Sequence, residues 1–226
     1  GFPFVSTNRF NAPPTLVDID GDGDLEIVAG NDSGLLHVLH HDGTEMVSYD
    51  VGDDIRGGIS VADLNDDGSY ELLFTGYDDM IHVWNPLDAV ELDGWPIDME
   101  YNSLTEPVTA DLDNNGDLEV ITAMKSGMVY VFHHDGTLFN NFPTDLSGNI
   151  ESSPAIGDLD GDGMGEVFWK TRDGDVFLRS IHHFDGNIQY ANYMSETQFI
   201  QYAKNSINYD SNIFIGLEMP SGWDTL

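Results

Sequence analysis

The chain has 226 residues, and because 41 are Asp or Glu but only 7 are Lys or Arg, its formal net charge is -34 at pH 7. Such a surface repels phosphate groups, which excludes nucleic acid and anionic lipid headgroups as direct partners and makes cations the expected ones. Hydrophobic residues make up 40% of the chain, enough for a folded core, whereas cysteine is absent and no apolar run is long enough to insert into a membrane.

A nine-residue acidic pattern occurs four times along the chain. Its copies are DIDGDGDLE at 18–26, DLNDDGSYE at 63–71, DLDNNGDLE at 111–119 and DLDGDGMGE at 158–166. The first aspartates of successive copies are 45, 48 and 47 residues apart. A repeat of this period predicts a solenoid, a propeller or another array of similar units.

Each repeat is expected to contain four short strands. The first ends at the first aspartate of the loop, and the second begins directly after the loop, at Ile27, Leu72, Val120 and Val167. The second strand is apolar on both faces, so it should be covered on both sides. A third, alternating strand leads to turns such as HHDGT at 40–44 and 133–137, where Asp-Gly predicts a hairpin to a fourth strand. Four antiparallel strands per repeat predict an all-β protein, a β-propeller or part of one.

The repeats also predict the domain organisation. Residues 1–190 are expected to hold four blades, and residues 191–226, which lack an acidic loop, either a degenerate fifth blade or the start of another domain. Aromatic-proline pairs beginning at Phe2, Trp95 and Phe142 suit outer edge strands, so residues 1 to about 10 are expected to complete another blade. An open end would expose strand edges, so further blades are expected from the same or another chain.

The acidic loops predict cation sites. In a tightly curled loop, alternate side chains can converge on one point, and a glycine permits the bend. Calcium fits better than magnesium, because calcium accepts six to eight oxygens in flexible geometry. Position 7 is expected to donate its backbone carbonyl, and the glutamate at position 9 is expected either to bind the ion or to bond to the loop's own amides. The predicted sites, about four in number, comprise Asp18, Asp20, Asp22, Asp24 and Glu26; Asp63, Asn65, Asp67, Ser69 and Glu71; Asp111, Asp113, Asn115, Asp117 and Glu119; and Asp158, Asp160, Asp162, Met164 and Glu166.

An isolated acidic stretch rich in Asp-Gly is also typical of a solvated turn. Oxygen donors at positions 1, 3 and 5 of all four copies favour the metal site. The sequences DIDGDGDLEIV, DLNDDGSYELL, DLDNNGDLEVI and DLDGDGMGEVF resemble the calcium loops of FG-GAP or VCBS-type repeats, the blades of integrin-α-like propellers and of many secreted bacterial proteins. The resemblance covers about residues 1–190. It implies propeller blades that bind calcium between strands one and two, in a structural rather than a catalytic role.

Two functions are expected from these features. The first is a calcium-stabilised binding or scaffolding module of the adhesion type, secreted or at the cell surface, with a protein or glycan ligand, because no catalytic set accompanies the loops. The alternative is a catalytic or non-catalytic propeller part of a carbohydrate-active enzyme, a polysaccharide lyase or hydrolase. For that alternative, the bases that could neutralise an acidic sugar are Lys125, Lys170, Arg172 and Arg179.

Two further groups of residues have structural interpretations. The histidine pairs at 40–41, 133–134 and 182–183 lie on separate repeats, so we interpret them as repeated hairpin residues rather than as zinc ligands. The tryptophans could line a sugar-binding platform, but packing between blades is the preferred interpretation for Trp84, Trp95, Trp169 and Trp223.

Overall fold

The computed structural model describes residues 1–146, 148–158, 165–172 and 176–179. These residues form β-strands and no helix, as the all-β prediction requires, and accordingly none of them belongs to a helix that could cross a membrane. Several predictions concern residues outside these ranges. They are the metal-ligand roles of Asp160, Asp162 and Met164, the packing of Trp223, the role of the histidine pair at 182–183 and the assignment of 191–226.

The strands form four antiparallel sheets in chain order, which we call blades 1 to 4. Blade 1 contains β1 (Thr15–Val17), β2 (Glu26–Gly30), β3 (Leu35–Leu39) and β4 (Glu45–Asp50). Blade 2 contains β5 (Ser60–Ala62), β6 (Glu71–Thr75), β7 (Met80–Asn85), β8 (Val90–Glu91) and β9 (Ile97–Asp98). Blade 3 contains β10 (Val108–Ala110), β11 (Glu119–Ala123), β12 (Met128–Phe132) and β13 (Thr144–Asp145), and the described part of blade 4 contains β14 (Ala155–Gly157), β15 (Glu166–Lys170) and β16 (Val176–Arg179).

The pairing register places every acidic loop between the first and second strands of its blade. Val17 pairs with Glu26 in blade 1, and Ala62 pairs with Glu71 in blade 2. The equivalent pairs are Ala110 with Glu119 and Gly157 with Glu166. Each loop is therefore the connection of a hairpin whose strands hold both of its ends.

Hydrophobic cores lie between successive blades and explain the apolar second strands. Leu72 and Phe74 of β6 pack with blade 1, whereas Leu73 of the same strand packs with blade 3. All five residues of β6 and all five of β11 are buried. A third core joins blade 3 to Val167 and Trp169 of blade 4. The prediction that the second strands are covered on both faces is confirmed for β6 and β11, whereas Ile27 and Ala29 of β2 and Phe168 of β15 are half-buried. The buried packing of three tryptophans, Trp84, Trp95 and Trp169, is also confirmed.

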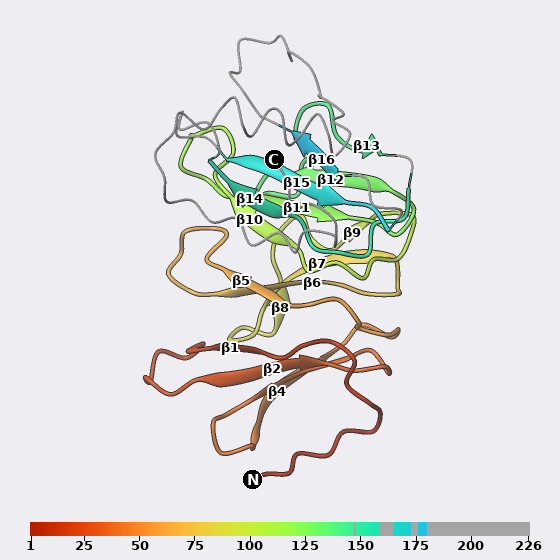
Figure 1. Cartoon of the computed structure of the whole chain (residues 1–226). Coiled ribbons are helices and arrows are strands. Elements are labelled where there is room, and N and C mark those ends of the chain that lie inside the picture. Colours follow the sequence, from red (N-terminus) through yellow and green to blue (C-terminus); the bar gives the residue numbers. More distant parts are fainter. Residues whose placement is uncertain (147, 159–164, 173–175, 180–226) are drawn as a thin grey trace, which may run out of the picture.

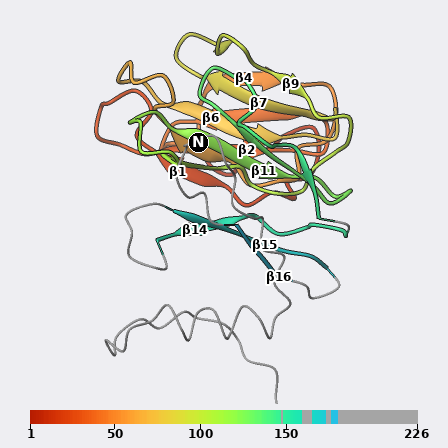
Figure 2. The ribbon, with the colours of Figure 1, turned by 90° about the horizontal axis from the view of Figure 1, so that it is seen from above.

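The blades follow one another along an open stack. Figure 1 shows the sheet of blade 1 near the N-terminus, blade 2 beside it and blades 3 and 4 at the other end. Figure 2, seen from above, shows that β14, β15 and β16 form a separate layer beside the earlier sheets. The described sheets do not close into a ring, so the partial-propeller form of the prediction is the one that the structure displays.

The aromatic-proline pairs precede outer strands, as expected. Trp95-Pro96 leads into β9 and Phe142-Pro143 leads into β13, and both peptide bonds are cis. Blade 2 differs from the expected four strands because its outer strand is split into β8 and β9, which both pair with β7. Within blade 2's outer segment, Gly94 lies so close to the carbonyl of Asp135 in the next blade's hairpin turn that a Cβ at position 94 would clash with it.

The N-terminal residues meet blade 1 in a similar way. A Cβ at Gly43, in the hairpin turn of blade 1, would lie 3.1 Å from the backbone of Gly1 and of Phe2. Gly1 therefore lies close to the hairpin turn of blade 1, in the same way that Gly94 lies close to the hairpin turn of blade 3. This arrangement suits an outer segment of another blade, and the assignment of residues 1 to about 10 to such a blade stays a prediction.

Candidate metal centre

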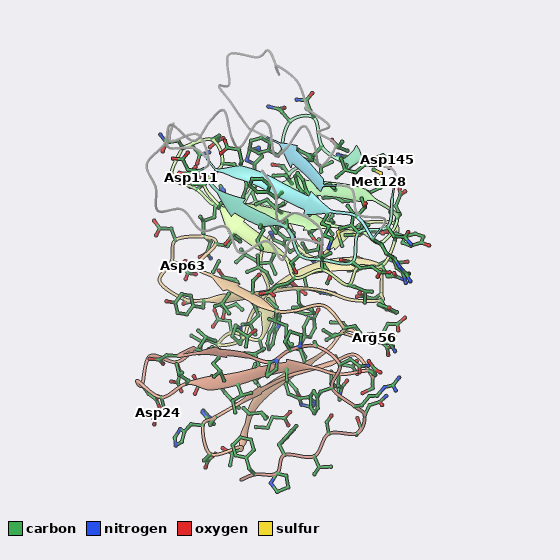
Figure 3. The ribbon with its side chains drawn as sticks, in the orientation of Figure 1. Asp24, Arg56, Asp63, Asp111, Met128 and Asp145 are labelled. Carbon is green, nitrogen blue, oxygen red and sulfur yellow. The ribbon has the colours of Figure 1, made fainter. Side chains whose placement is uncertain are left out.

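The three acidic loops that the structure describes in full lie on one side of the stack. Figure 3 shows Asp24, Asp63 and Asp111 along one edge, whereas Arg56, Met128 and Asp145 lie along the opposite edge. The first set marks the hairpin connections between strands one and two. The repeat therefore places equivalent acidic loops in a row, one for each blade.

The first loop is curled around its own aspartates. The two oxygens of Asp18 accept hydrogen bonds from the amides of Gly21, at 2.8 Å, and Gly23, at 3.1 Å. Both glycines have positive φ, 74° and 95°, which a residue without Cβ adopts at little cost. Carboxylate oxygens of Asp18, Asp20 and Asp22 lie within 4.8 Å of one another. The structure thus brings together the side chains at positions 1, 3 and 5, which we expected to be ligands.

The second and third loops repeat this geometry. Asp63 accepts from the amides of Asp67 and Gly68, and Asp111 accepts from those of Asn115 and Gly116. At position 3, Asn65 and Asp113 each accept from the amide of position 5, at 3.1 and 3.2 Å. The amide of position 7 donates to the side chain of position 5 in all three loops, at 2.8, 2.8 and 2.6 Å for Asp24, Ser69 and Asp117.

The glutamate at position 9 points away from solvent. Glu26, Glu71 and Glu119 are each fully buried, and one carboxylate oxygen accepts a hydrogen bond from the amide at position 2, at 2.9, 2.9 and 2.8 Å. Burial raises the pKa of Glu71 and the pKa of Glu119, partly offset by this bond. Of the two roles expected for position 9, the geometry favours bonding to the loop's own amide.

The second carboxylate oxygen of each of these three glutamates faces a residue at the end of the third strand. In blade 2 it accepts from Asn85 Nδ2 at 3.1 Å. In blades 1 and 3 the facing atom is a histidine Nδ1, of His40 at 3.5 Å and of His133 at 3.3 Å. Sequence reasoning missed these pairs. The signal was present in the strand pairing, because Ile27 opposes Leu39, which brings Glu26 and His40 opposite each other.

In blades 1 and 3 the second histidine of the pair also contacts its loop. His41 Nδ1 lies 3.3 Å from Asp24 Oδ2, and His134 Nδ1 lies 3.7 Å from Asp117 Oδ2. Blade 2 lacks both the aspartate and the histidine of this contact, because Ser69 occupies position 7 and Pro86 occupies the place of the histidine in the turn. The histidine pairs at 40–41 and 133–134 therefore contact the acidic loops of their own blades, and the pair at 182–183 lies outside the described residues.

The fourth loop can be followed only at its two ends. Asp158 follows β14, and Glu166 begins β15 and is fully buried, like its three counterparts. The remaining predicted ligands of this loop lie outside the described residues. What is described matches the first three loops at position 9.

The donors of these loops fit calcium. Positions 1, 3 and 5 present carboxylate and amide oxygens, the hard ligands that calcium takes, and the loops are exposed, so an ion and its waters have access. The side chain of position 7 varies among Asp24, Ser69 and Asp117, which suits a ligand donated by the main chain. Asp18, Asp20 and Asp22, with their counterparts in the other loops, are the residues that could hold the ion.

Three of the four basic residues of the alternative function lie away from these loops, whereas Arg179 ends β16 and pairs with Val167, next to the fourth loop. Lys125 follows β11, whereas Lys170 ends β15 and Arg172 is two residues further along. Arg172 Nη1 lies 3.4 Å from Glu151 Oε1. This exposed ion pair is typical of a solvated blade surface.

Comparison with known proteins gives a family match and several structural similarities. Residues 92–169 match the model of the FG-GAP-like repeat family. No curated protein matches the chain. The computationally designed Ika4 protein is similar in structure, with a TM-score of 0.55 at 15% identity over 79% of this chain and 94% of Ika4.

Two natural proteins are also similar in fold. The biofilm matrix protein Bap1 of V. cholerae has a TM-score of 0.54 at 20% identity, and Sqt1 of Saccharomyces cerevisiae has a TM-score of 0.58 at 14% identity. The similar region covers 73% of this chain and 26% of Bap1, and 76% of this chain and 45% of Sqt1. The chain thus spans less than half of either protein, and the likeness shows the fold alone.

Proposed function

Because residues 92–169 are an FG-GAP-like repeat and the described sheets have a propeller-type fold, we propose that the chain is a binding or scaffolding module stabilised by calcium. The observation that carries the proposal is the convergence of Asp18, Asp20 and Asp22 in a loop whose geometry recurs in the next two blades. Each ion would replace repulsion among clustered carboxylates by shared attraction, so its role would be structural.

The proposal includes a location outside the cell, secreted or at the surface. Calcium modules of this kind typically bind with dissociation constants of about 10⁻⁴ to 10⁻³ M, and sites this weak fill only where calcium is plentiful. A net charge of -34 favours cations and disfavours polyanions as partners. We propose a protein or glycan ligand. In support of a protein ligand, one protein of similar fold, BBS1N, is described in complex with ARL6DN, at a TM-score of 0.55 and 12% identity.

Calorimetry and thermal unfolding test the calcium proposal. Titration of the full chain with CaCl₂ should give binding in the range above, and EDTA should lower the melting temperature. Asp18→Asn combined with Asp20→Asn should remove one calcium ion per chain, whereas the exposed Asp88→Asn should not. An identical melting temperature with and without EDTA would remove the proposal.

A further inference from the structure

Blades 1 and 3 each contain a group of three potential metal ligands, which combines two acidic residues of the loop with a histidine from outside it. The groups are Asp20, Glu26 and His40 in blade 1, and Asp113, Glu119 and His133 in blade 3. In each group the aspartate comes from position 3 of the loop, the glutamate from position 9, and the histidine from the end of the third strand. The three ligand atoms of each group lie within 4.8 Å of one another.

The buried oxygen of Glu26 is the first observation that points to a ligand. Glu26 is fully buried, and its Oε1 has no hydrogen-bond partner. The facing His40 Nδ1 lies 3.5 Å from Glu26 Oε1. His37 bonds to Glu45 and His82 bonds to Glu91 at 2.6 Å, whereas in blade 3 His133 Nδ1 bonds to Glu119 Oε1 at 3.3 Å. A buried carboxylate oxygen without a donor is rare in folded proteins, so another partner is expected at this point.

The separation between histidine and glutamate matches two ligands of one metal ion. Zinc binds histidine nitrogen and carboxylate oxygen at distances of about 2.0–2.2 Å, and in a tetrahedral site two such atoms are about 3.4 Å apart. The observed separations are 3.5 Å for His40 and Glu26 and 3.3 Å for His133 and Glu119. Both are long for a charge-assisted hydrogen bond, which is typically about 2.7–2.9 Å.

Blade 2 shows how the same place looks when the ligands are replaced. Its position 3 is Asn65 and its third strand ends in Asn85, so the aspartate and the histidine of blades 1 and 3 are both absent. Asn85 Nδ2 donates to Glu71 Oε1 at 3.1 Å, which satisfies the buried oxygen. In blade 2 an amide donor thus stands where we place the ion in blades 1 and 3.

We propose that Asp20, Glu26 and His40 bind one zinc ion, and that Asp113, Glu119 and His133 bind a second. An imidazole nitrogen selects a borderline metal such as zinc over calcium, which prefers oxygen ligands. Three protein ligands leave a fourth position for water or for a group of a bound partner. Asp20 also belongs to the cluster with Asp18 and Asp22, so its two oxygens can face both ions.

The test is zinc titration of the full chain, by calorimetry and by equilibrium dialysis, in saturating CaCl₂. The double variant His40→Gln/His133→Gln removes both proposed nitrogen ligands, while each glutamine amide can donate to the buried glutamate as Asn85 does in blade 2. The matched control is His41→Gln/His134→Gln, which changes the adjacent histidines. Thermal unfolding checks that both variants fold.

We expect the control to bind two more zinc ions per chain than the double variant, and each single variant, His40→Gln or His133→Gln, to lose one. Calcium titrations of the same variants should be unchanged, which separates this proposal from the calcium proposal. Adding Asn65→Asp and Asn85→His should create a third site in blade 2.

Three results would overturn the proposal. The first is equal zinc stoichiometry in the double variant and the control. The second is zinc that calcium displaces ion for ion, which would assign it to the acidic loops. The third is no zinc uptake at micromolar concentration by the wild-type chain.

Discussion

His82 is a buried histidine held between two carboxylates, and it should make the stability of blade 2 depend on pH. Its side chain is 3% exposed, with Nε2 2.9 Å from Asp78 Oδ2 and Nδ1 2.6 Å from Glu91 Oε1. Burial lowers the pKa of His82, but the hydrogen bonds to Asp78 and Glu91 raise it more, so that the pKa rises from 6.5 to about 8. Tyr49 of blade 1, whose ring lies 5.8 Å away, stays neutral because burial and the charge of Glu91 raise its pKa.

The direction and the magnitude of the change in stability with pH follow from this pKa shift. Because the pKa of His82 is higher in the folded state than in the unfolded state, its contribution to stability is fully present below pH 6.5 and is lost as the pH rises through 8. A shift from 6.5 to about 8 corresponds to about 2 kcal/mol of unfolding free energy. For a protein of this size, that is a fall in melting temperature of about 4–8 °C.

Urea unfolding at a series of pH values from 6 to 9, with calcium saturating throughout, measures this effect. The wild type should lose about 2 kcal/mol across the interval. His82→Gln should remove that loss, and Glu91→Gln should reduce it, since one charged partner of the imidazolium is gone. His41→Gln, at an exposed histidine, is the control and should follow the wild type. Persistence of the full loss in His82→Gln would refute the reasoning.

Three further changes test the packing and the loops. Phe74→Ala, in the core between blades 1 and 2, should cost about 3–5 kcal/mol of unfolding free energy by urea titration, whereas the exposed Leu16→Ala should change it by less than about 0.5; equal costs would contradict the buried position of Phe74. Glu71→Ala leaves a buried amide without its acceptor, so it should destabilise by about 1–3 kcal/mol and weaken calcium binding measured by calorimetry, whereas Asp88→Ala should do neither. Asp32 accepts hydrogen bonds from Arg56 and Arg9, which lower its pKa to about 2. Its contribution to the unfolding free energy is therefore present above pH 3.8 and is lost as the pH falls through 2. Asp32→Asn should make the unfolding free energy less dependent on pH in this interval, and an unchanged pH dependence would disprove the role.

The strands and the cores could be predicted from the sequence because they repeat. Comparing equivalent positions of the four repeats showed that strands such as β6 are apolar on both faces. The structure places Leu72 and Leu73 in cores on opposite faces of the sheet of blade 2. The position of the acidic loops followed from the same comparison. A repeated pattern averages out local exceptions, which is why these predictions were confirmed.

The partners within each repeat could not be found in this way. The contact between Glu26 and His40 joins two different positions of the same repeat, and it appears only once the register of β2 and β3 is known. From the sequence we compared the histidine pairs of different repeats as possible zinc ligands, whereas the structure brings the histidines at 40–41 and 133–134 to acids of their own repeats. The contact of His82 could not be predicted either, because its acidic partner Glu91 comes from an outer strand whose position the repeat left open.

The cores between the blades have a consequence for how the protein comes apart. Blades 2 and 3 each share apolar surface with two neighbours, so separating the stack beside them exposes hydrophobic side chains of both partners to water. Opening therefore proceeds most easily from a terminal unit, and the array should fray inward step by step rather than break in its middle. A protease or a pulling force would then meet an ordered sequence of barriers, one for each interface.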